Sequence, residues 1–252
     1  MKGLQRKEKV VAIVPAAGFG KRFGPGTNKS FQTLGGKPIV VWSLEKLEAA
    51  VEVIEIIPVL KMEDMEEGLE VLEKYGISKV KRIAPGGKER QDSVYNGLKL
   101  IEDKNYIVLI HDGVRPLIEK ELIERTIKEL QFATTPVSRG SEAVPKGFDG
   151  VVLGVPLKDT IKEAEDGIVK KTLKRDALWA VQTPQVFFYK NILAAYEKAM
   201  KEGVYFTDDA ALVERYGGKI KVVMGSYRNI KITTSEDLAI AGILLKTRNE
   251  EI

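Results

Sequence analysis

Short apolar runs alternate with segments of helical periodicity along the first half of the chain. Residues 10–14, Val-Val-Ala-Ile-Val, are mostly β-branched and lead into Pro15 and a glycine-rich loop, which predicts a buried parallel strand. Further strands are expected at 53–60, 80–83 and 106–110, and helices at 38–50, 63–75, 91–101 and 119–130. This alternation is typical of an α/β fold with a doubly wound, mostly parallel sheet.

The second half has a different pattern. Residues 150–156 predict a strand, whereas 158–174 are charged and interrupted by Gly167, which favours an extended hairpin over a core helix. Helices are expected at 191–201, 208–216 and 236–246, a strand at 220–224, and a surface loop at 132–149. Because no linker rich in proline, glycine or serine divides the sequence, we expect one domain over residues 1–252.

Composition restricts the class of function. The 252 residues contain 40 Lys and Arg against 36 Asp and Glu, and the net charge of +4 suits small anionic substrates better than nucleic acid. Cysteine is absent, which excludes disulfides and thiolate chemistry, and the single histidine, His111, excludes any site that needs two. No apolar run approaches the roughly 20 residues that span a bilayer, and the basic, polar residues 1–10 do not resemble a signal peptide. We therefore expect a cytoplasmic enzyme with no membrane partner.

The glycine-rich segment after the first strand is a candidate phosphate site. It reads Pro15-Ala16-Ala17-Gly18-Phe19-Gly20-Lys21-Arg22, and small residues at such a place allow backbone N–H groups to approach phosphate oxygens. Phe23 rules out a dinucleotide fingerprint, and Arg22 after Gly20-Lys21 rules out a Walker A loop. Lys21, Arg22 and Lys29 suit a triphosphate, yet a tight turn with solvated basic side chains accounts for the pattern equally well.

Seven motifs, in order along the chain, carry a family resemblance. The loop and Asn28-Lys29 resemble the signature of sugar and alditol nucleotidyltransferases. With the other six they are similar to the family of 2-C-methyl-D-erythritol 4-phosphate cytidylyltransferases, over about residues 10–245. The other six are Gly86-Gly-Lys-Glu-Arg90-Gln-Asp-Ser93-Val94, His111-Asp112-Gly-Val-Arg115-Pro116, Asp159-Thr160-Ile-Lys162, Thr183-Pro184-Gln185, Thr207-Asp208 and Asn229-Ile230-Lys231.

The chain departs from the family pattern in three places. Asn28 and Ser30 flank the loop lysine where the family usually has proline and glutamine, which bears on the angle at which the backbone enters Lys29. Gly113-Val114 stand where two alanines are usual, although the acid, arginine and proline of that motif are kept. The connection 132–149 is also longer than in most relatives.

The resemblance implies a Rossmann-like nucleotidyltransferase fold and a magnesium-dependent reaction of non-mevalonate isoprenoid biosynthesis. The phosphate of 2-C-methyl-D-erythritol 4-phosphate would attack the α-phosphorus of CTP in line, forming 4-diphosphocytidyl-2-C-methyl-D-erythritol and releasing pyrophosphate. Such chemistry depends on positioning and charge neutralisation more than on a covalent nucleophile. By position in the motifs, Arg22 and Lys29 are the expected catalytic cations.

The same matching assigns the expected binding residues. Those for CTP are Ala16, Ala17, Gly18, Gly20, Gly87, Ser93 and Asp112. Those for the alditol phosphate are Asp112, Arg115, Thr160, Arg175, Thr183, Thr207 and Lys231. Asp112 follows the most apolar strand, where a carboxylate suits either Mg²⁺ or substrate hydroxyls, and an Asp turn before Gly113 is the structural alternative. Arg115 either holds the substrate phosphate or pairs with Asp112, and we assign no chemistry to His111.

Residues 154–178 are expected to form a protruding β-arm that makes a homodimer. Val155, Leu157, Ile161 and Ile168 have no obvious place in the core of their own domain, and exposed apolar side chains would be a liability. The resemblance implies that the arm interlocks with the partner's arm, and that Thr160 and Arg175 serve the neighbouring active site.

Three other functions are weighed against this one. The nearest is a ribitol-5-phosphate cytidylyltransferase, because one extra methyl or hydroxyl group in a pocket changes discrimination by only about 1–3 kcal/mol. A non-catalytic nucleotide-binding protein of the same fold should have lost a catalytic cation, yet Arg22 and Lys29 are both present. A purine-using pyrophosphorylase is opposed by the segment 86–93.

Overall fold

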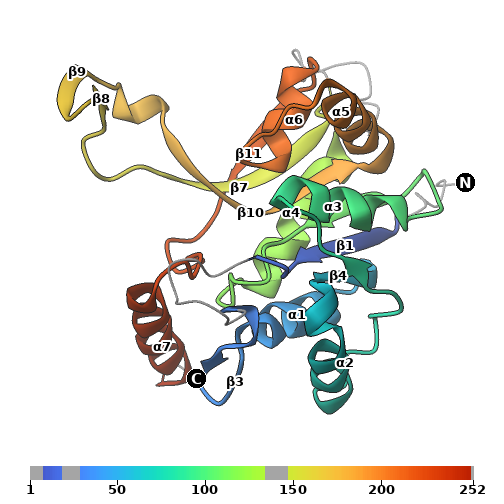
Figure 1. Ribbon diagram of the computed structural model, residues 1–252. Coiled ribbons are helices and arrows are strands. Elements are labelled where there is room, and N and C mark those ends of the chain that lie inside the picture. Colours follow the sequence, from blue (N-terminus) through green and yellow to red (C-terminus); the bar gives the residue numbers. More distant parts are fainter. Residues whose placement is uncertain (1–7, 19–28, 134–146, 251–252) are drawn as a thin grey trace, which may run out of the picture.

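A seven-stranded sheet forms the centre of the structure, a computed structural model that describes residues 8–18, 29–133 and 147–250 (Figure 1). Across the sheet the strands lie in the order β11 (Ile220–Met224), β7 (Gly150–Pro156), β10 (Trp179–Phe188), β6 (Ile107–Ile110), β1 (Val10–Pro15), β4 (Val53–Leu60) and β5 (Ala84–Pro85). Neighbouring strands are parallel except that β10 runs antiparallel to both β6 and β7. The mostly parallel sheet predicted from the sequence is confirmed.

Helices cover both faces of this sheet, so the fold is doubly wound. One face packs against α1 (Ile39–Ala49), α2 (Met65–Lys74) and α4 (Lys120–Phe132), and the other against α3 (Arg90–Lys99), α5 (Tyr189–Glu202) and α6 (Asp209–Arg215). Successive strand residues point to opposite faces, so Val10, Ala12 and Val14 join one core cluster and Val11 and Ile13 the other. Each fully buried aliphatic side chain of this kind contributes about 1.5–3 kcal/mol.

A third, smaller core cluster joins the C-terminal helix α7 (Ser235–Glu250) to the N-terminal half of the chain. Leu245 of α7 packs with Leu34 in a hairpin of β2 (Thr33–Leu34) and β3 (Lys37–Pro38). The hairpin turn is Gly35-Gly36, whose φ values of 56° and 87° favour glycine and are typical of a type I′ turn. The same cluster contains Val114 and Ile232, which bring the end of β6 and the segment after β11 together.

One predicted strand is misplaced, and β2, β3 and β10 are strands that the sequence did not predict. The strand predicted at 80–83 is wrong: Val80 forms only an isolated bridge with Ile56, and the paired strand is β5, beside the end of β4. Strand β10 was not predicted as an element, because Pro184 interrupts it and Gln182 and Thr183 break its apolar pattern. The structure accommodates the interruption with a cis Thr183-Pro184 bond and a register shift against β7.

Helix ends follow their local sequence signals. Helix α2 is followed by Gly76 with φ of 62°, as expected for a glycine that stops a helix. Helix α6 begins after Asp208, whose side chain accepts a hydrogen bond from the Ala211 N–H in the N-cap arrangement. Three 3₁₀ turns, η1 (Lys29–Phe31), η2 (Met62–Asp64) and η3 (Arg175–Ala177), connect longer elements. Phe132, assigned to a loop from the sequence, is the last residue of α4, and most of that loop (134–146) lies outside the described residues.

A two-stranded arm projects from the sheet between β7 and β10 (Figure 1). Its antiparallel strands β8 (Lys162–Glu165) and β9 (Ile168–Thr172) meet at Asp166-Gly167, whose φ values of 50° and 79° form a tight hairpin turn. The hairpin confirms the sequence-based prediction. Its expected start at 154 is wrong, because β7 continues to Pro156 and Val155 is a core residue with 5 % exposure. The antiparallel pairing of β7 with β10 draws these residues into the central sheet.

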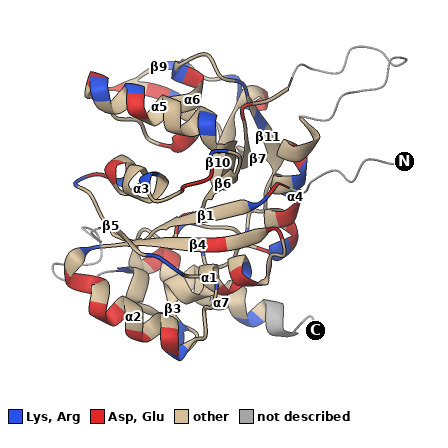
Figure 2. Cartoon of the chain, turned by 90° about the vertical axis from the view of Figure 1, so that its right-hand side faces the viewer, with Lys and Arg blue, Asp and Glu red and all other residues tan. Residues whose placement is uncertain are grey.

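Charged residues of both signs share the outer helices. Figure 2 shows Lys and Arg beside Asp and Glu on α2 and α5, while β1 is mostly uncharged. The charged faces of these helices point to solvent, whereas the central strand is buried and apolar. Among the residues that the structure describes, no helix is both long enough and apolar enough to cross a membrane.

Candidate active site

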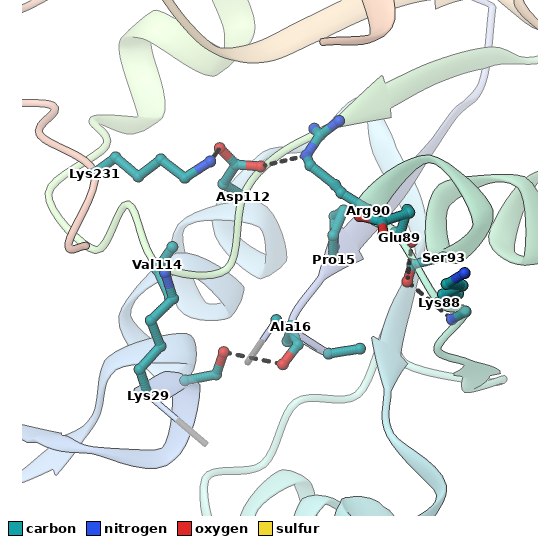
Figure 3. A pocket seen from close by; sticks show the side chains of 14 residues that line it. Pro15, Ala16, Lys29, Lys88, Glu89, Arg90, Ser93, Asp112, Val114 and Lys231 are labelled. Atoms are coloured by element: carbon teal, nitrogen blue, oxygen red, sulfur yellow. Dashed lines mark hydrogen bonds and ion pairs between the residues drawn. The ribbon is translucent and has the colours of Figure 1, made fainter. Parts of the chain in front are cut away.

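A cavity of about 320 Å³ lies beyond the carboxyl ends of β1 and β6, where ligands bind in open α/β sheets (Figure 3). Its walls come from the loop after β1, from η1, from the start of α3, from the residues after β6 and from the segment after β11. The lining residues are Pro15, Ala16, Ala17, Gly18, Lys29, Ser30, Gly87, Lys88, Glu89, Arg90, Ser93, Asp112, Val114 and Lys231. Most of the expected CTP-binding residues therefore meet in one place.

The loop after β1 is held close to two other backbones. The Ala16 N–H donates to the Val59 carbonyl at 2.9 Å, and the Ala16 carbonyl accepts from Ser30 Oγ at 3.0 Å. A side chain at Gly86 would place its Cβ 2.6 Å from the Ala17 Cβ, so that the two loops can approach only because one residue is glycine. The result is a wall of small side chains and backbone groups, which suits a flat heterocycle and phosphate oxygens.

The segment before α3 has a shape that depends on Gly87 and Ser93. The Gly87 N–H donates to Ser93 Oγ at 3.0 Å, and Ser93 Oγ donates to the Glu89 carbonyl at 3.1 Å. A Cβ at Gly87 would lie 2.2 Å from the Cβ of Asp92. The hydroxyl proton of Ser93 is thus already used within the loop, and Ser93 contributes to the cavity by fixing the loop's course.

Asp112 is the buried carboxylate of the site, and three cations surround it. Figure 3 shows two of them, Arg90 and Lys231. Its Oδ1 lies 3.1 Å from Arg90 Nε, and its Oδ2 lies 2.9 Å from Lys231 Nζ and 3.6 Å from Arg115 Nε. Burial opposes the charged form, but Arg90, Lys231 and Arg115 outweigh it and hold the pKa of Asp112 well below its usual range. Asp112 is therefore ionised at every physiological pH.

Arg90 is a lining residue whose importance the sequence did not reveal. Its position at the start of a helix is typical of a solvent-facing charge, yet its side chain is only 28 % exposed and binds both Asp112 and Asp209. Asp209 is fully buried and also accepts a hydrogen bond from the Tyr196 hydroxyl. No local signal distinguishes Arg90 from its charged neighbours, because both carboxylates reach it from elements distant in sequence.

His111 and Thr183 form a buried support behind Asp112. Both are almost fully buried, and Thr183 Oγ1 accepts from the Asp112 N–H at 3.0 Å. The His111 ring bonds to Thr183 Oγ1 at 3.1 Å and to the Arg115 carbonyl at 3.3 Å, which fits a neutral ring that accepts at Nδ1 and donates at Nε2. Burial lowers the pKa of His111 to about 4. His111 therefore supports the backbone around Asp112, and Thr183 is not among the residues that line the cavity.

Arg115 and Lys231 differ in their access to the cavity. Arg115 is 9 % exposed and donates from Nη1 to the Asn229 carbonyl at 2.8 Å, besides facing Asp112. The pairing with Asp112, one of the two roles considered from the sequence, is present in the structure, and contact with a substrate phosphate stays a prediction. The Lys231 side chain is 36 % exposed and lines the cavity. Lys231 therefore has both a fixed partner and access to a ligand.

Thr160, Arg175 and Thr207 do not line this cavity. Thr160 and Arg175 belong to the exposed arm, where Arg175 Nη1 donates to the Lys158 carbonyl at 2.7 Å. Thr207 is exposed just before α6. Arg22 and Gly20 lie outside the described residues. The arm residues can reach an active site only if that site belongs to another chain or if the arm moves.

The described side chains around the cavity supply few oxygen ligands for a magnesium ion. Within residues 8–18, 29–133 and 147–250, no three His, Cys, Asp or Glu side chains gather as metal ligands. Asp112 has both oxygens engaged by cations, and a magnesium ion there would need most of its ligands from phosphates and water, as is common for Mg²⁺.

Comparisons with known proteins point to a single family. The model of the 2-C-methyl-D-erythritol 4-phosphate cytidylyltransferase (IspD) family matches residues 10–247. A protein of that name from Geotalea uraniireducens is 45 % identical over 246 residues, which cover 96 % of this chain and 99 % of the relative. Another from Geobacter metallireducens is 42 % identical over 245 residues, covering 95 % and 98 %.

Solved structures agree with the sequence relatives. The crystal structure of 4-diphosphocytidyl-2C-methyl-D-erythritol synthase from Anaerococcus prevotii matches with a TM-score of 0.79 and 33 % identity, covering 95 % of this chain and 97 % of that one. The 2-C-methyl-D-erythritol 4-phosphate cytidylyltransferase from Thermus thermophilus matches with a TM-score of 0.71 and 27 % identity, covering 93 % and 98 %. Because the family model spans almost its whole length and relatives of the same name match at 42–45 % identity, this chain belongs to the 2-C-methyl-D-erythritol 4-phosphate cytidylyltransferase family.

Proposed function

We propose that this chain transfers CMP from CTP to 2-C-methyl-D-erythritol 4-phosphate, releasing pyrophosphate and forming 4-diphosphocytidyl-2-C-methyl-D-erythritol. The observation that carries the proposal is the composition of the cavity. Small residues and backbone groups form one wall, Lys231 pairs with the ionised Asp112 at another, and Lys29 lines the same cavity. A nucleotide needs the first kind of surface, and the transfer of a phosphoryl group needs the second.

CTP occupies the side of the cavity between Ala17 and Gly87. Small residues and backbone groups of both loops line the cavity there, and a small pocket of this kind would favour a single-ring base over a purine. The triphosphate then extends along the glycine loop towards Lys29, at the start of η1. Arg22 belongs to the same loop and serves with Lys29 as the second catalytic cation in this proposal.

The chemistry is an in-line displacement at the α-phosphorus. An oxygen of the alditol phosphate forms the new P–O bond while the bond to the pyrophosphate oxygen breaks, and pyrophosphate carries away the electron pair. Negative charge grows on the leaving group and on the equatorial oxygens, and Lys29 and Arg22 stabilise it by charge-assisted hydrogen bonds. No protein nucleophile is required.

Asp112 and Lys231 orient the acceptor. Lys231 is bound to Asp112 yet exposed to the cavity, so its ammonium can also contact an incoming phosphate. Asp112, held by its three cations, accepts hydrogen bonds from the hydroxyl groups of the alditol. If magnesium enters with the triphosphate, Asp112 would be its protein ligand, and the ion would neutralise phosphate charge.

The arm completes the site from a second copy of the chain in this proposal. Ile168 is 73 % exposed and Val169 is 54 % exposed, which is costly for an isolated hairpin and reasonable for a buried interface. Thr160 and Arg175 lie on this arm away from the cavity of their own chain, so a homodimer would allow them to grip the alditol phosphate of the partner. Contact of Thr183 and Thr207 with the alditol phosphate stays a prediction, because neither residue lines the cavity. We also propose a cytoplasmic location, where CTP is available.

One experiment tests the assignment directly. Pyrophosphate release should be measured for CTP, UTP, ATP and GTP against 2-C-methyl-D-erythritol 4-phosphate and ribitol 5-phosphate. The proposal expects turnover chiefly with CTP and the methylerythritol substrate. Faster turnover with ribitol 5-phosphate would favour the sister activity, and turnover with no pair at all would favour a nucleotide-binding protein without catalysis.

A further inference from the structure

Asp209 is a buried carboxylate with no role in the reaction as described so far. It begins α6 and has 0 % exposure. A buried carboxylate is tolerated where its charge is paired and its oxygens are hydrogen-bonded. Arg90 supplies the opposite charge through a bidentate contact, with Nη1 at 3.0 Å from Oδ1 and Nη2 at 2.8 Å from Oδ2 of Asp209. The hydroxyl of the fully buried Tyr196 donates to Oδ1 as well.

The same guanidinium reaches the active-site carboxylate. Nε of Arg90 lies 3.1 Å from Oδ1 of Asp112, and Figure 3 shows Arg90, Asp112 and Lys231 in a row beside the cavity. One side chain therefore joins the start of α3, the end of β6 and the start of α6. A planar group with five donors can hold two carboxylates in fixed directions, whereas a lysine ammonium is a single point of charge.

We infer that Asp209 is a positioning residue for the transfer reaction, acting through Arg90 on Asp112. The inference rests on the proposed function. With Asp209 in place, the charge of Arg90 is matched inside the protein and its orientation is fixed. Without Asp209, Arg90, Arg115 and Lys231 surround a single carboxylate, and Arg90 is drawn towards the triphosphate. Asp112 then loses its Oδ1 partner, and the Asp112–Lys231 pair loses its place beside the acceptor.

A purely structural role for Asp209 makes a different prediction. It would lower stability without changing the kinetics of the molecules that remain folded. The chain contains a matched pair for comparison: Arg82 grips Glu55 with Nε at 2.8 Å and Nη2 at 2.9 Å, and Glu55 is 7 % exposed. Neither residue lines the candidate active site. Glu55→Gln therefore makes the same chemical change as Asp209→Asn at a place where only stability can respond.

The first test compares these two variants. Asp209→Asn keeps the shape of the side chain and removes its charge. At a temperature where melting curves show both proteins folded, Asp209→Asn should lower kcat about tenfold or more, as misplaced active-site groups do, with Kd for CTP within about threefold of wild type. Glu55→Gln should keep wild-type kcat and KM. Equal kinetics for Asp209→Asn and wild type would overturn the inference.

The second test asks whether Asp209 acts through Arg90. In an Arg90→Lys background the two-carboxylate contact is already lost, so adding Asp209→Asn should change kcat by less than about twofold. If the two substitutions multiply their effects, Asp209 acts by some other route and the inference fails.

The third test does not depend on catalysis. In ¹⁵N-labelled protein, the Nε–H of Arg90 should exchange slowly with solvent, and Asp209→Asn should shift or broaden its signal while Glu55→Gln leaves it unchanged. Tyr196→Phe, which keeps the charge of Asp209 and removes one of its hydrogen bonds, should perturb the same signal and serves if Asp209→Asn does not fold. An Arg90 signal unaffected by these variants contradicts the inference, whereas absence of cytidylyl transfer in the wild type contradicts only the proposed function.

Discussion

Asp112 Oδ2 and Lys231 Nζ lie 2.9 Å apart, although Asp112 follows β6 and Lys231 follows β11. A backbone hydrogen bond beside them, from the Ile232 N–H to the Val114 carbonyl at 2.9 Å, fixes the two segments together. The pair places a cation from the second half of the chain at a cavity built by the first half.

The nucleotide pocket depends on the absence of a side chain at Gly87. Gly87→Ala would bring a methyl group 2.2 Å from the Asp92 Cβ, so the loop must move. We expect KM for CTP to rise about tenfold or more, with a smaller change in KM for the alditol phosphate. Steady-state kinetics with each substrate varied in turn will show this. The control is Gly242→Ala in α7, where an added Cβ meets nothing closer than 4.0 Å, and an unchanged KM for CTP in Gly87→Ala would remove the loop from CTP binding.

Lys29 is expected to act on the transition state more than on binding. Lys29→Ala should lower kcat about a hundredfold or more, as loss of a charge-stabilising donor does, while Kd for CTP changes less. Stopped-flow single turnover and equilibrium titration separate the two effects. The exposed Lys104 offers a matched control, because Lys104→Ala removes the same charge away from the cavity. A near-wild-type kcat in Lys29→Ala would leave Lys29 with no catalytic role, and Arg22→Ala tests the second cation in the same way.

Arg175 is expected to serve the active site of the partner chain. Homodimers of Lys29→Ala and of Arg175→Ala, each nearly inactive, should regain activity when their subunits exchange, approaching half of wild type per hybrid dimer. The reason is that one site of each hybrid then holds both defects and the other holds none. As a control, Lys29→Ala mixed with Lys231→Ala should not recover, because both residues line one cavity. Absence of recovery for Arg175→Ala after demonstrated exchange would assign Arg175 to its own chain.

His111 makes the stability of the protein depend on pH. Its folded-state pKa is about 4, below the ordinary value of 6.5. Between these pH values the unfolded chain binds a proton at His111 that the folded chain does not bind. The free energy of unfolding should therefore rise with pH from 4 to 6.5, by up to about 3 kcal/mol from this group. Denaturant unfolding of wild type and His111→Gln at several pH values will show whether the variant has the smaller slope.

The pKa of His111 can also be measured directly. The chain has one histidine, so a single ring titrates in an NMR experiment and its assignment is unambiguous. We expect an unchanged neutral ring down to about pH 5. A pKa of 6 or above would contradict the buried, neutral His111, and with it the hydrogen-bond arrangement that supports Asp112.

The sequence by itself determined the elements whose signal is local. Residues 53–60 form a strand with the predicted bounds, because a strand buried on both faces must be apolar at nearly every position. Gly167 predicted the hairpin of the arm, and Gly76 predicted the end of α2. Both glycines adopt the left-handed conformation that such turns and helix ends require. The ordered motifs also gave the family, and with it the loop residues that line the cavity.

The tertiary structure alone decided which partners the buried charges of the site have. Arg90 has the local sequence of a solvent-facing helix start, and only the packing of α3, β6 and α6 places it between Asp112 and Asp209. Strand β10, which contains Pro184, is a strand because β6 and β7 supply partners on both sides. Val155 was predicted to belong to the arm, but it lies in β7, where pairing with β10 makes it part of the central sheet. Local sequence sets the conformations that a segment can adopt, whereas the partners of a buried charge or a strand edge come from distant segments and depend on the folded packing.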